Sequence, residues 1–185
     1  MTTTNNSQPF LTDVQELRRR AREQIEKGAV TQDYGLDPNQ AIELLQNALA
    51  TEIVCVLRYT MHSVAATGIS SEGVKSEFAQ HAAEERGHME QIAERINQLG
   101  GTPNFNPEGL LSRSASEYGS AELDLVGMIK ENLIAERIAI EHYRELIRYF
   151  GEKDPTTRTM LEEILAVEEE HANDMSDLLS AHSGN

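Results

Sequence analysis

Four long stretches of the sequence space apolar residues at alternating intervals of three and four, which lines one face of an α-helix. They span about residues 38–67, 71–99, 121–150 and 154–180. Helix formers such as Ala, Leu, Glu, Gln and Arg are common, and β-branched runs with alternating polarity are missing. The 185 residues are enough for one well-packed domain, so we expect a single all-α domain.

Capping residues mark where the helices begin. Asp37-Pro38 and Asp154-Pro155 each place a capping carboxylate before a proline at the first helical position. A shorter helix is expected from Thr12, which would cap it, to about Lys27, where Gly28 ends it. We therefore divide the chain into an N-terminal tail and short helix, residues 1–36, and a helical domain, residues 37–182.

The connections between the helices predict their topology. The first two long helices are joined by a short link, and so are the last two. Between the pairs lies TPNFNPEGLLSRSASEYGS, residues 102–120, a stretch rich in Pro, Gly and Ser. Two helical hairpins joined by one long crossover form the ferritin-like variant of the four-helix bundle.

A carboxylate interrupts each apolar stripe near its middle. In the second and fourth helices a histidine follows three residues later, and Glu and His at this spacing project from one helix face. Because the stripes meet in the core of a bundle, six side chains should converge there: Glu52, Glu85, His88, Glu136, Glu168 and His171.

Four carboxylates cannot share a dry core without partners, because burying each unpaired charge costs several kcal/mol. Two divalent cations would balance the charge. Oxygen-rich ligand sets that include imidazole suit iron or manganese, whereas zinc usually takes fewer carboxylates. One Glu from each of two helices and Glu-x-x-His from the other two is the ligand pattern of carboxylate-bridged dinuclear sites.

Position makes this pattern specific, because Glu-x-x-His alone is a weak signal. Glu52 and Glu85 are 33 residues apart, and Glu136 and Glu168 are 32 apart, so the two hairpins repeat one arrangement. The alternative is a bundle with a few buried polar residues whose hydrogen bonds are satisfied.

Composition narrows the possible functions. The net charge of −15 argues against a surface that binds nucleic acid throughout and suits a cationic partner. The single cysteine, Cys55, excludes an intrachain disulfide and a Cys-rich zinc site. We expect no membrane span, because no apolar run approaches the roughly 18 residues that a span needs, and the N-terminus lacks the apolar region of a signal peptide. We expect a cytoplasmic protein that does not bind membranes.

Three motifs resemble bacterioferritin, a member of the ferritin-like superfamily: ATEIVCVLRY, HAAEERGHMEQIAERINQLGGTPN and EILAVEEEHANDM. The similarity covers about residues 38–180. It implies a ferroxidase that oxidises Fe(II) with O2 or H2O2 and stores ferric mineral in a hollow shell. On this resemblance two iron ions per subunit, for which manganese or zinc could substitute, are bound by Glu52, Glu85, His88, Glu136, Glu168 and His171, with Glu85 and Glu136 as bridges.

Other features depart from bacterioferritin. Arg86 stands where that family has its haem-binding methionine, so we expect no haem. Only 14 residues follow His171, too few for the fifth helix of the 24-subunit shell. The N-terminal helix and the longer crossover resemble the Dps-like mini-ferritins, whose shells have 12 subunits. The usual Dps site lies between subunits, whereas this one is complete within one chain. We expect a dodecamer of the bacterioferritin-related, Dps-like group, with a 24-mer as the alternative.

The sequence allows more than one role for each of four residues near the expected centre. Tyr59 matches a bacterioferritin tyrosine that donates an electron, but it could equally be a core tyrosine bonded to a ligand carboxylate. For Tyr143 we favour the second role. Cys55 is a small core residue or a thiol exposed to peroxide, and His81 is an ordinary core residue, a neighbour that orients a ligand or an entry ligand.

Two other functions remain as alternatives. A DNA-protecting protein of the Dps type could use the arginines at positions 18, 19, 20 and 22, although Glu16, Glu23 and Glu26 dilute their charge. A solvated helix face is the preferred interpretation. The second alternative is a peroxidase that resembles di-manganese catalase; a rubrerythrin would need a Cys-rich domain, which one cysteine cannot supply.

Overall fold

The computed structural model describes residues 13–68 and 70–182, and within these ranges every regular element is helical. The chain order is α1 (Val14–Arg20), a 3-10 turn (Ile25–Lys27), α2 (Pro38–Ala65), α3 (Ser71–Gln98), α4 (Leu110–Arg113), α5 (Leu125–Phe150) and α6 (Pro155–His182). The prediction of an all-α domain is confirmed.

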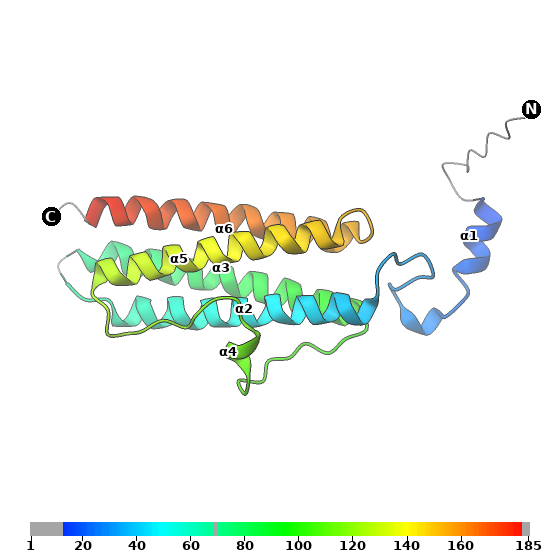
Figure 1. Ribbon diagram of the computed structural model, residues 1–185, viewed down its shortest axis with the longest axis horizontal. Coiled ribbons are helices and arrows are strands. Elements are labelled where there is room, and N and C mark those ends of the chain that lie inside the picture. The colour runs from blue at the N-terminus through cyan, green and yellow to red at the C-terminus, as the bar shows by residue number, and fades with distance from the viewer. Residues whose placement is uncertain (1–12, 69, 183–185) are drawn as a thin grey trace, which may run out of the picture.

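The four long helices, α2, α3, α5 and α6, lie side by side in one bundle, while α1 stands apart from it (Figure 1). Helix α2 packs along α3 and α5 packs along α6, which gives the two expected hairpins. The crossover between them runs along the outside of α2. This is the predicted ferritin-like topology.

Hydrogen bonds hold the crossover to α2 along most of its length. Gln46 Nε2 donates to the carbonyl of Thr102 (2.7 Å), and the amide of Ala115 donates to Thr51 Oγ1 (3.0 Å). Nearer the end of α2, Arg58 Nη1 donates to the carbonyl of Glu117 (2.9 Å). Because the crossover returns the chain to the far end of α2, α5 starts there and runs antiparallel to α2.

The helix ends show how far capping can be read from the sequence. The carboxylates of Asp37 and Asp154 accept hydrogen bonds from the amides of Asn39 (3.0 Å) and Thr157 (2.9 Å), as predicted. Helix α5 begins at Leu125, later than the predicted residue 121, because Asp124 caps it through the amide of Gly127 (2.7 Å).

The N-terminal helix is shorter than predicted. Thr12, the expected cap, lies outside the described residues, and Asp13 caps α1 instead. The helix ends at Arg20, and Gln24 takes a left-handed conformation (φ 50°) before the 3-10 turn. Helix α1 has no buried residue, so no packing against a core extends it toward Lys27.

The apolar core is divided into two large clusters. One, around Leu45, Ile92 and Phe150, fills the end of the bundle at the start of α2; the other, around Phe78 and Met175, fills the opposite end. The predicted carboxylates and histidines lie between them. Polar residues thus form a layer in the middle of the bundle.

Helix α2 corrects one expectation from the sequence. It is long and apolar enough, by length and composition, to cross a membrane. In this fold the apolar residues of α2 serve packing, because α3 covers one side of the helix and the crossover covers another. It also carries Glu52 and Arg58, both buried inside the bundle.

Candidate metal centre

Each of the four long helices contributes to one buried polar layer. None of its six side chains belongs to a residue more than 5% exposed: Glu52, Glu85, His88, Glu136, Glu168 and His171. The sequence predicted this convergence from spacing alone, and the structure brings all six together.

The six residues form two overlapping groups. One joins Glu52, Glu85, His88 and Glu168; the other joins Glu85, Glu136, Glu168 and His171, and within each group the potential ligand atoms lie within 4.8 Å of one another. Glu85 and Glu168 belong to both groups. The arrangement therefore favours Glu85 and Glu168 as shared ligands, in place of the expected Glu85 and Glu136. Spacing along a helix gives the height of a side chain in the bundle, but not which carboxylates lie between the two histidines.

The donor atoms of this layer are poorly satisfied within the protein. Among the described residues, Glu52 Oε2, Glu85 Oε1, Glu136 Oε2, Glu168 Oε2 and His171 Nδ1 are buried without a hydrogen-bond partner, and Glu168 Oε1 has only the His88 ring beside it, with Nδ1 at 2.9 Å. Native cores pair nearly all such atoms, so a cluster of unpaired ones calls for a bound partner. Carboxylate oxygens and imidazole nitrogens that converge from four helices fit two divalent cations.

The pKa values of the layer also indicate that its carboxylates lack a compensating cation. Burial raises the pKa of Glu52 to about 8, with the Glu85 carboxylate adding to the effect. Burial lowers the pKa of His88, but the carboxylates of Glu168, Glu52 and Glu85 outweigh it and hold that pKa far above its usual range. Without a cation, the layer thus retains protons in order to reduce repulsion between its carboxylates.

His88 acts as the local positive charge of this layer. Its Nδ1 lies 2.9 Å from Glu168 Oε1 and 3.2 Å from Glu85 Oε2. Burial raises the pKa of Glu85, but the neighbouring rings of His171 and His88 outweigh it, so the net pKa lies far below the usual range. A divalent cation would take over the role that protonated imidazole plays here.

Two buried tyrosines form hydrogen bonds to carboxylates of the polar layer across the bundle. The hydroxyl of Tyr59, from α2, donates to Glu136 Oε1 on α5, and the hydroxyl of Tyr143, from α5, donates to Glu52 Oε1 on α2. Each hairpin thus orients a carboxylate of the other. Both hydroxyls thus make the hydrogen bond to a core carboxylate that the sequence analysis considered, while electron donation by Tyr59 stays a prediction.

Glu84 is a contributor that sequence reasoning missed. His171 Nε2 donates to Glu84 Oε2 (2.7 Å), which leaves Nδ1 of the same ring free to face Glu85 at 3.6 Å. A carboxylate that fixes the second nitrogen of a metal-binding histidine is common in metal sites. The signal was the adjacent pair Glu84-Glu85, which places one carboxylate in the core and one at its edge.

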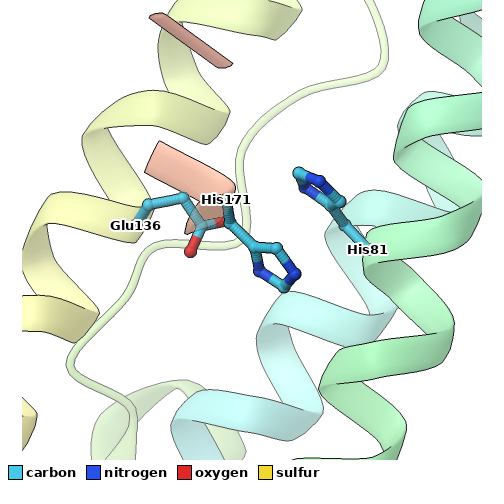
Figure 2. Close-up of side chains that lie close together, drawn as sticks. All are labelled: His81, Glu136 and His171. Carbon is cyan, nitrogen blue, oxygen red and sulfur yellow. The ribbon is translucent and has the colours of Figure 1, made fainter. Parts of the chain in front are cut away.

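His81 lies beside the layer and is fully buried. Its ring stacks on that of His171, with centroids 3.9 Å apart and an interplanar angle of 19° (Figure 2). His81 Nδ1 lies 3.2 Å from the hydroxyl of Tyr59. Burial, together with the neighbouring His171, lowers the pKa of His81 to about 4, so the ring is neutral near pH 7.

Cys55 fits its structural role better than a reactive one. Its residue is 1% exposed, and Arg58 Nη2 lies 3.6 Å from its sulfur. Burial raises the pKa of the thiol well above its usual range. The reactive thiolate is therefore disfavoured.

A cavity of about 250 Å³ opens next to the polar layer, between α3 and α6. Its lining includes both motif histidines, His88 and His171, together with the carboxylates of Glu84, Glu170 and Asp174. Because acidic side chains attract cations, this cavity is a suitable approach for metal ions.

The fold and this site define a class: a ferritin-like bundle with a carboxylate and histidine centre. Comparison with known proteins agrees, because the family model described as "Ferritin-like domain" matches residues 42–183. The chain belongs to this family.

Individual relatives narrow the class. The chain is 32% identical to the DNA protection during starvation protein of Pyrococcus furiosus, over 79% of this chain and 80% of that protein. It is 26% identical to Mycobacterium tuberculosis bacterioferritin BfrA, over 73% and 80%. A solved structure, the dodecameric thioferritin of Bacteroides fragilis, described as bacterioferritin-related, matches with a TM-score of 0.77 and 34% identity, covering 80% of this chain and 89% of that one. The chain is thus a ferritin-like protein of the Dps and bacterioferritin type.

Proposed function

We propose that this protein is a ferroxidase that takes up Fe(II) as substrate, oxidises it at a dinuclear centre within each subunit, and stores the ferric product inside a protein shell. The observation that carries the proposal is the set of buried, unpaired donor atoms on Glu52, Glu85, Glu136, Glu168 and His171. Two Fe(II) ions would satisfy them and balance the charge of four carboxylates.

The residues would divide the work as follows. Glu52 and His88 would hold one ion, Glu136 and His171 would hold the other, and Glu85 and Glu168 would be shared by both. Each Fe(II) substrate ion would give one electron to the same oxidant, so that two Fe(II) ions and two protons would convert O2 to H2O2, or H2O2 to two waters. Manganese or zinc could occupy the same donors, and no haem is part of the proposal.

The protein chain contributes order around this centre. Tyr59 and Tyr143 hold Glu136 and Glu52 in place, and Glu84 fixes the ring of His171. The apolar clusters on either side exclude water from both ends of the layer. The donors are therefore arranged before the metal arrives, which favours fast binding and oxidation.

The shell forms part of the same proposal. Each site is complete within one chain, so assembly would serve storage and not the chemistry itself. The Bacteroides fragilis relative is a dodecamer, which favours 12 subunits over the alternative of 24. A cytoplasmic location remains our prediction from the sequence.

The test is the rate of Fe(II) oxidation at about two irons per subunit, under O2 and then under anaerobic H2O2, on protein sized by light scattering. We expect fast oxidation by the assembled protein, and its loss in the double variant Glu85→Ala with His88→Ala. The bundle should remain folded in that variant, because buried charge is removed from the core. The matched control is Glu90→Ala with Glu94→Ala, two exposed residues of the same helix.

Two outcomes would count against this function. Oxidation that survives in the Glu85 and His88 double variant would place the chemistry elsewhere in the molecule. Absence of oxidation, with peroxide disproportionated only after manganese loading, would favour the catalase-like alternative.

A further inference from the structure

A second, smaller group of donors lies next to the polar layer, at the edge of the bundle between α3 and α6. It consists of Glu77, His81 and Asp174, whose potential ligand atoms lie within 4.8 Å of one another. His81 Nε2 lies 3.4 Å from Glu77 Oε1 and 3.5 Å from Asp174 Oδ2. The two carboxylates are partly exposed, with side chains 33% and 41% accessible, while His81 is fully buried.

His81 Nε2 lies beside these two carboxylates but makes no hydrogen bond to any described residue. A buried imidazole nitrogen without a partner is uncommon in folded proteins. The other ring nitrogen, Nδ1, is used, because it lies 3.2 Å from the hydroxyl of Tyr59. The ring nitrogen left without a partner is therefore Nε2, the one next to Glu77 and Asp174.

The hydrogen bonds of Tyr59 decide which nitrogen of His81 carries the proton. The hydroxyl of Tyr59 donates its one hydrogen to Glu136, so its oxygen accepts from His81 Nδ1–H. In a neutral ring the proton on Nδ1 leaves a lone pair on Nε2. That lone pair then faces two carboxylate oxygens, an arrangement that repels unless a cation lies between them.

We propose that Glu77, His81 and Asp174 form a third binding site for a divalent transition-metal cation, separate from the dinuclear centre and next to its entrance. Two carboxylates balance the charge of one such ion, and one nitrogen with two oxygens suits Fe(II), Mn(II), Co(II) or Zn(II). The site rests on the proposed function in its use alone, because it would supply ions to the dinuclear centre.

The position of the site gives it a use. Asp174 also lines the cavity that reaches His88 and His171, and the His81 ring lies against the His171 ring (Figure 2). An ion held by Glu77, His81 and Asp174 would therefore wait within one side-chain layer of the centre. Its partly exposed carboxylates can exchange ions with solvent, whereas the buried carboxylates of the centre cannot do so directly.

The test measures the number of bound metal ions with Co(II), which binds donors of this kind and keeps its oxidation state during the titration. Metal-free, assembled protein is equilibrated with Co(II), and bound metal per chain is measured for three forms. These are the unaltered chain, the variant Glu77→Gln with Asp174→Asn, and the matched control Glu72→Gln with Asp177→Asn, which removes the same charge from exposed residues of α3 and α6. Crystals of each form give the positions of the ions by anomalous scattering.

We expect the unaltered chain and the control to bind one ion more per chain than the Glu77 and Asp174 variant. The extra anomalous peak should lie between Glu77, His81 and Asp174, while the two peaks of the centre persist in all three forms. Two central peaks with none at His81 in the unaltered chain would overturn the third site and leave the dinuclear centre standing. No peak among Glu52, Glu85, Glu136 and Glu168 would overturn the proposed function itself.

Discussion

At the scale of single residues, the same two-sided use of a side chain recurs around the centre. His171 gives Nε2 to Glu84 and turns Nδ1 to the carboxylates of the layer. Tyr59 likewise gives its hydrogen to Glu136 and receives one from His81. Each polar group thus satisfies a neighbour with one atom and presents another for function, which is how a buried polar network can remain ordered.

The two tyrosines allow a matched test of electron donation. Both hydroxyls bind a ligand carboxylate, but only Tyr59 also contacts His81. If Tyr59 supplies an electron during oxidation, Tyr59→Phe should slow Fe(II) oxidation several-fold and remove any tyrosyl radical signal, whereas Tyr143→Phe should retain both. Stopped-flow absorbance and freeze-quenched electron paramagnetic resonance measure the two effects. Equal slowing in both variants would show that the hydroxyls only orient carboxylates.

Metal binding should release protons near neutral pH. Burial lowers the pKa of His171, but the Glu85 carboxylate outweighs it and raises the pKa to about 9, while burial raises that of Glu52 to about 8. Both groups are thus protonated in the metal-free protein at pH 7, and both must lose the proton in order to bind a metal. Affinity should therefore rise as pH increases from about 6 toward about 9.

Calorimetry of Co(II) binding in two buffers of different ionisation enthalpy measures this release directly. The buffer takes up the released protons, so the measured heat of binding should differ between the two buffers by an amount that follows their enthalpies of protonation. Equal heats would mean that the layer is already deprotonated before the metal arrives.

At the scale of helices, Asp154 joins three elements at the start of α6. Arg95 Nη2 on α3 donates to its carboxylate (2.9 Å), the hydroxyl of Tyr34 donates to it (2.9 Å), and the amide of Thr157 completes the cap. Asp37, at the start of α2, caps a helix in the same Asp-Pro motif, but within residues 13–68 and 70–182 no such network surrounds it. This difference separates a buried cap from an exposed one.

Asp154→Ala should therefore destabilise the fold much more than Asp37→Ala. Loss of Asp154 leaves Arg95 buried without its ion pair, which costs about 3–5 kcal/mol, whereas loss of an exposed cap costs about 1 kcal/mol. Thermal unfolding of the assembled protein, followed by circular dichroism, compares the two variants. Similar midpoints would show that the Arg95 network adds nothing beyond capping.

The elements also show what the sequence could predict and what it could not. Apolar spacing and the Asp-Pro caps predicted the four long helices, and the lengths of the connections predicted their pairing, because all these signals are local. The same spacing placed Glu52, Glu85, Glu136 and Glu168 in one layer. It could not show that Glu168 faces both histidines, or that Asp174 and Glu77 lie near His81, because these depend on the rotation of α6 against α3.

At the scale of the whole molecule, the net negative charge favours binding of metal cations and disfavours binding of DNA. The chain carries a net charge of −15, and residues 1–12 contain no Lys or Arg. In α1, Arg19 Nη2 pairs with Glu16 at 2.8 Å, and Arg20 Nη1 pairs with Asp33 at 2.7 Å. The arginine cluster is thus partly neutralised by its own neighbours, although relatives are named for DNA protection and DNA binding.

We therefore expect no DNA retardation on a gel at physiological salt, because phosphate contacts need free positive charge and weaken steeply as salt rises. The variant Glu16→Gln with Asp33→Asn should free Arg20, leave Arg19 with Glu23 as its one remaining partner among the described residues, and produce weak retardation that appears only at low salt. Glu141→Gln with Glu169→Gln, which frees Arg144 on the bundle, is the matched control for charge alone. Retardation of the unaltered protein at physiological salt, lost when Arg18 and Arg22 are replaced by Gln, would instead assign a DNA-protecting role to the N-terminal segment.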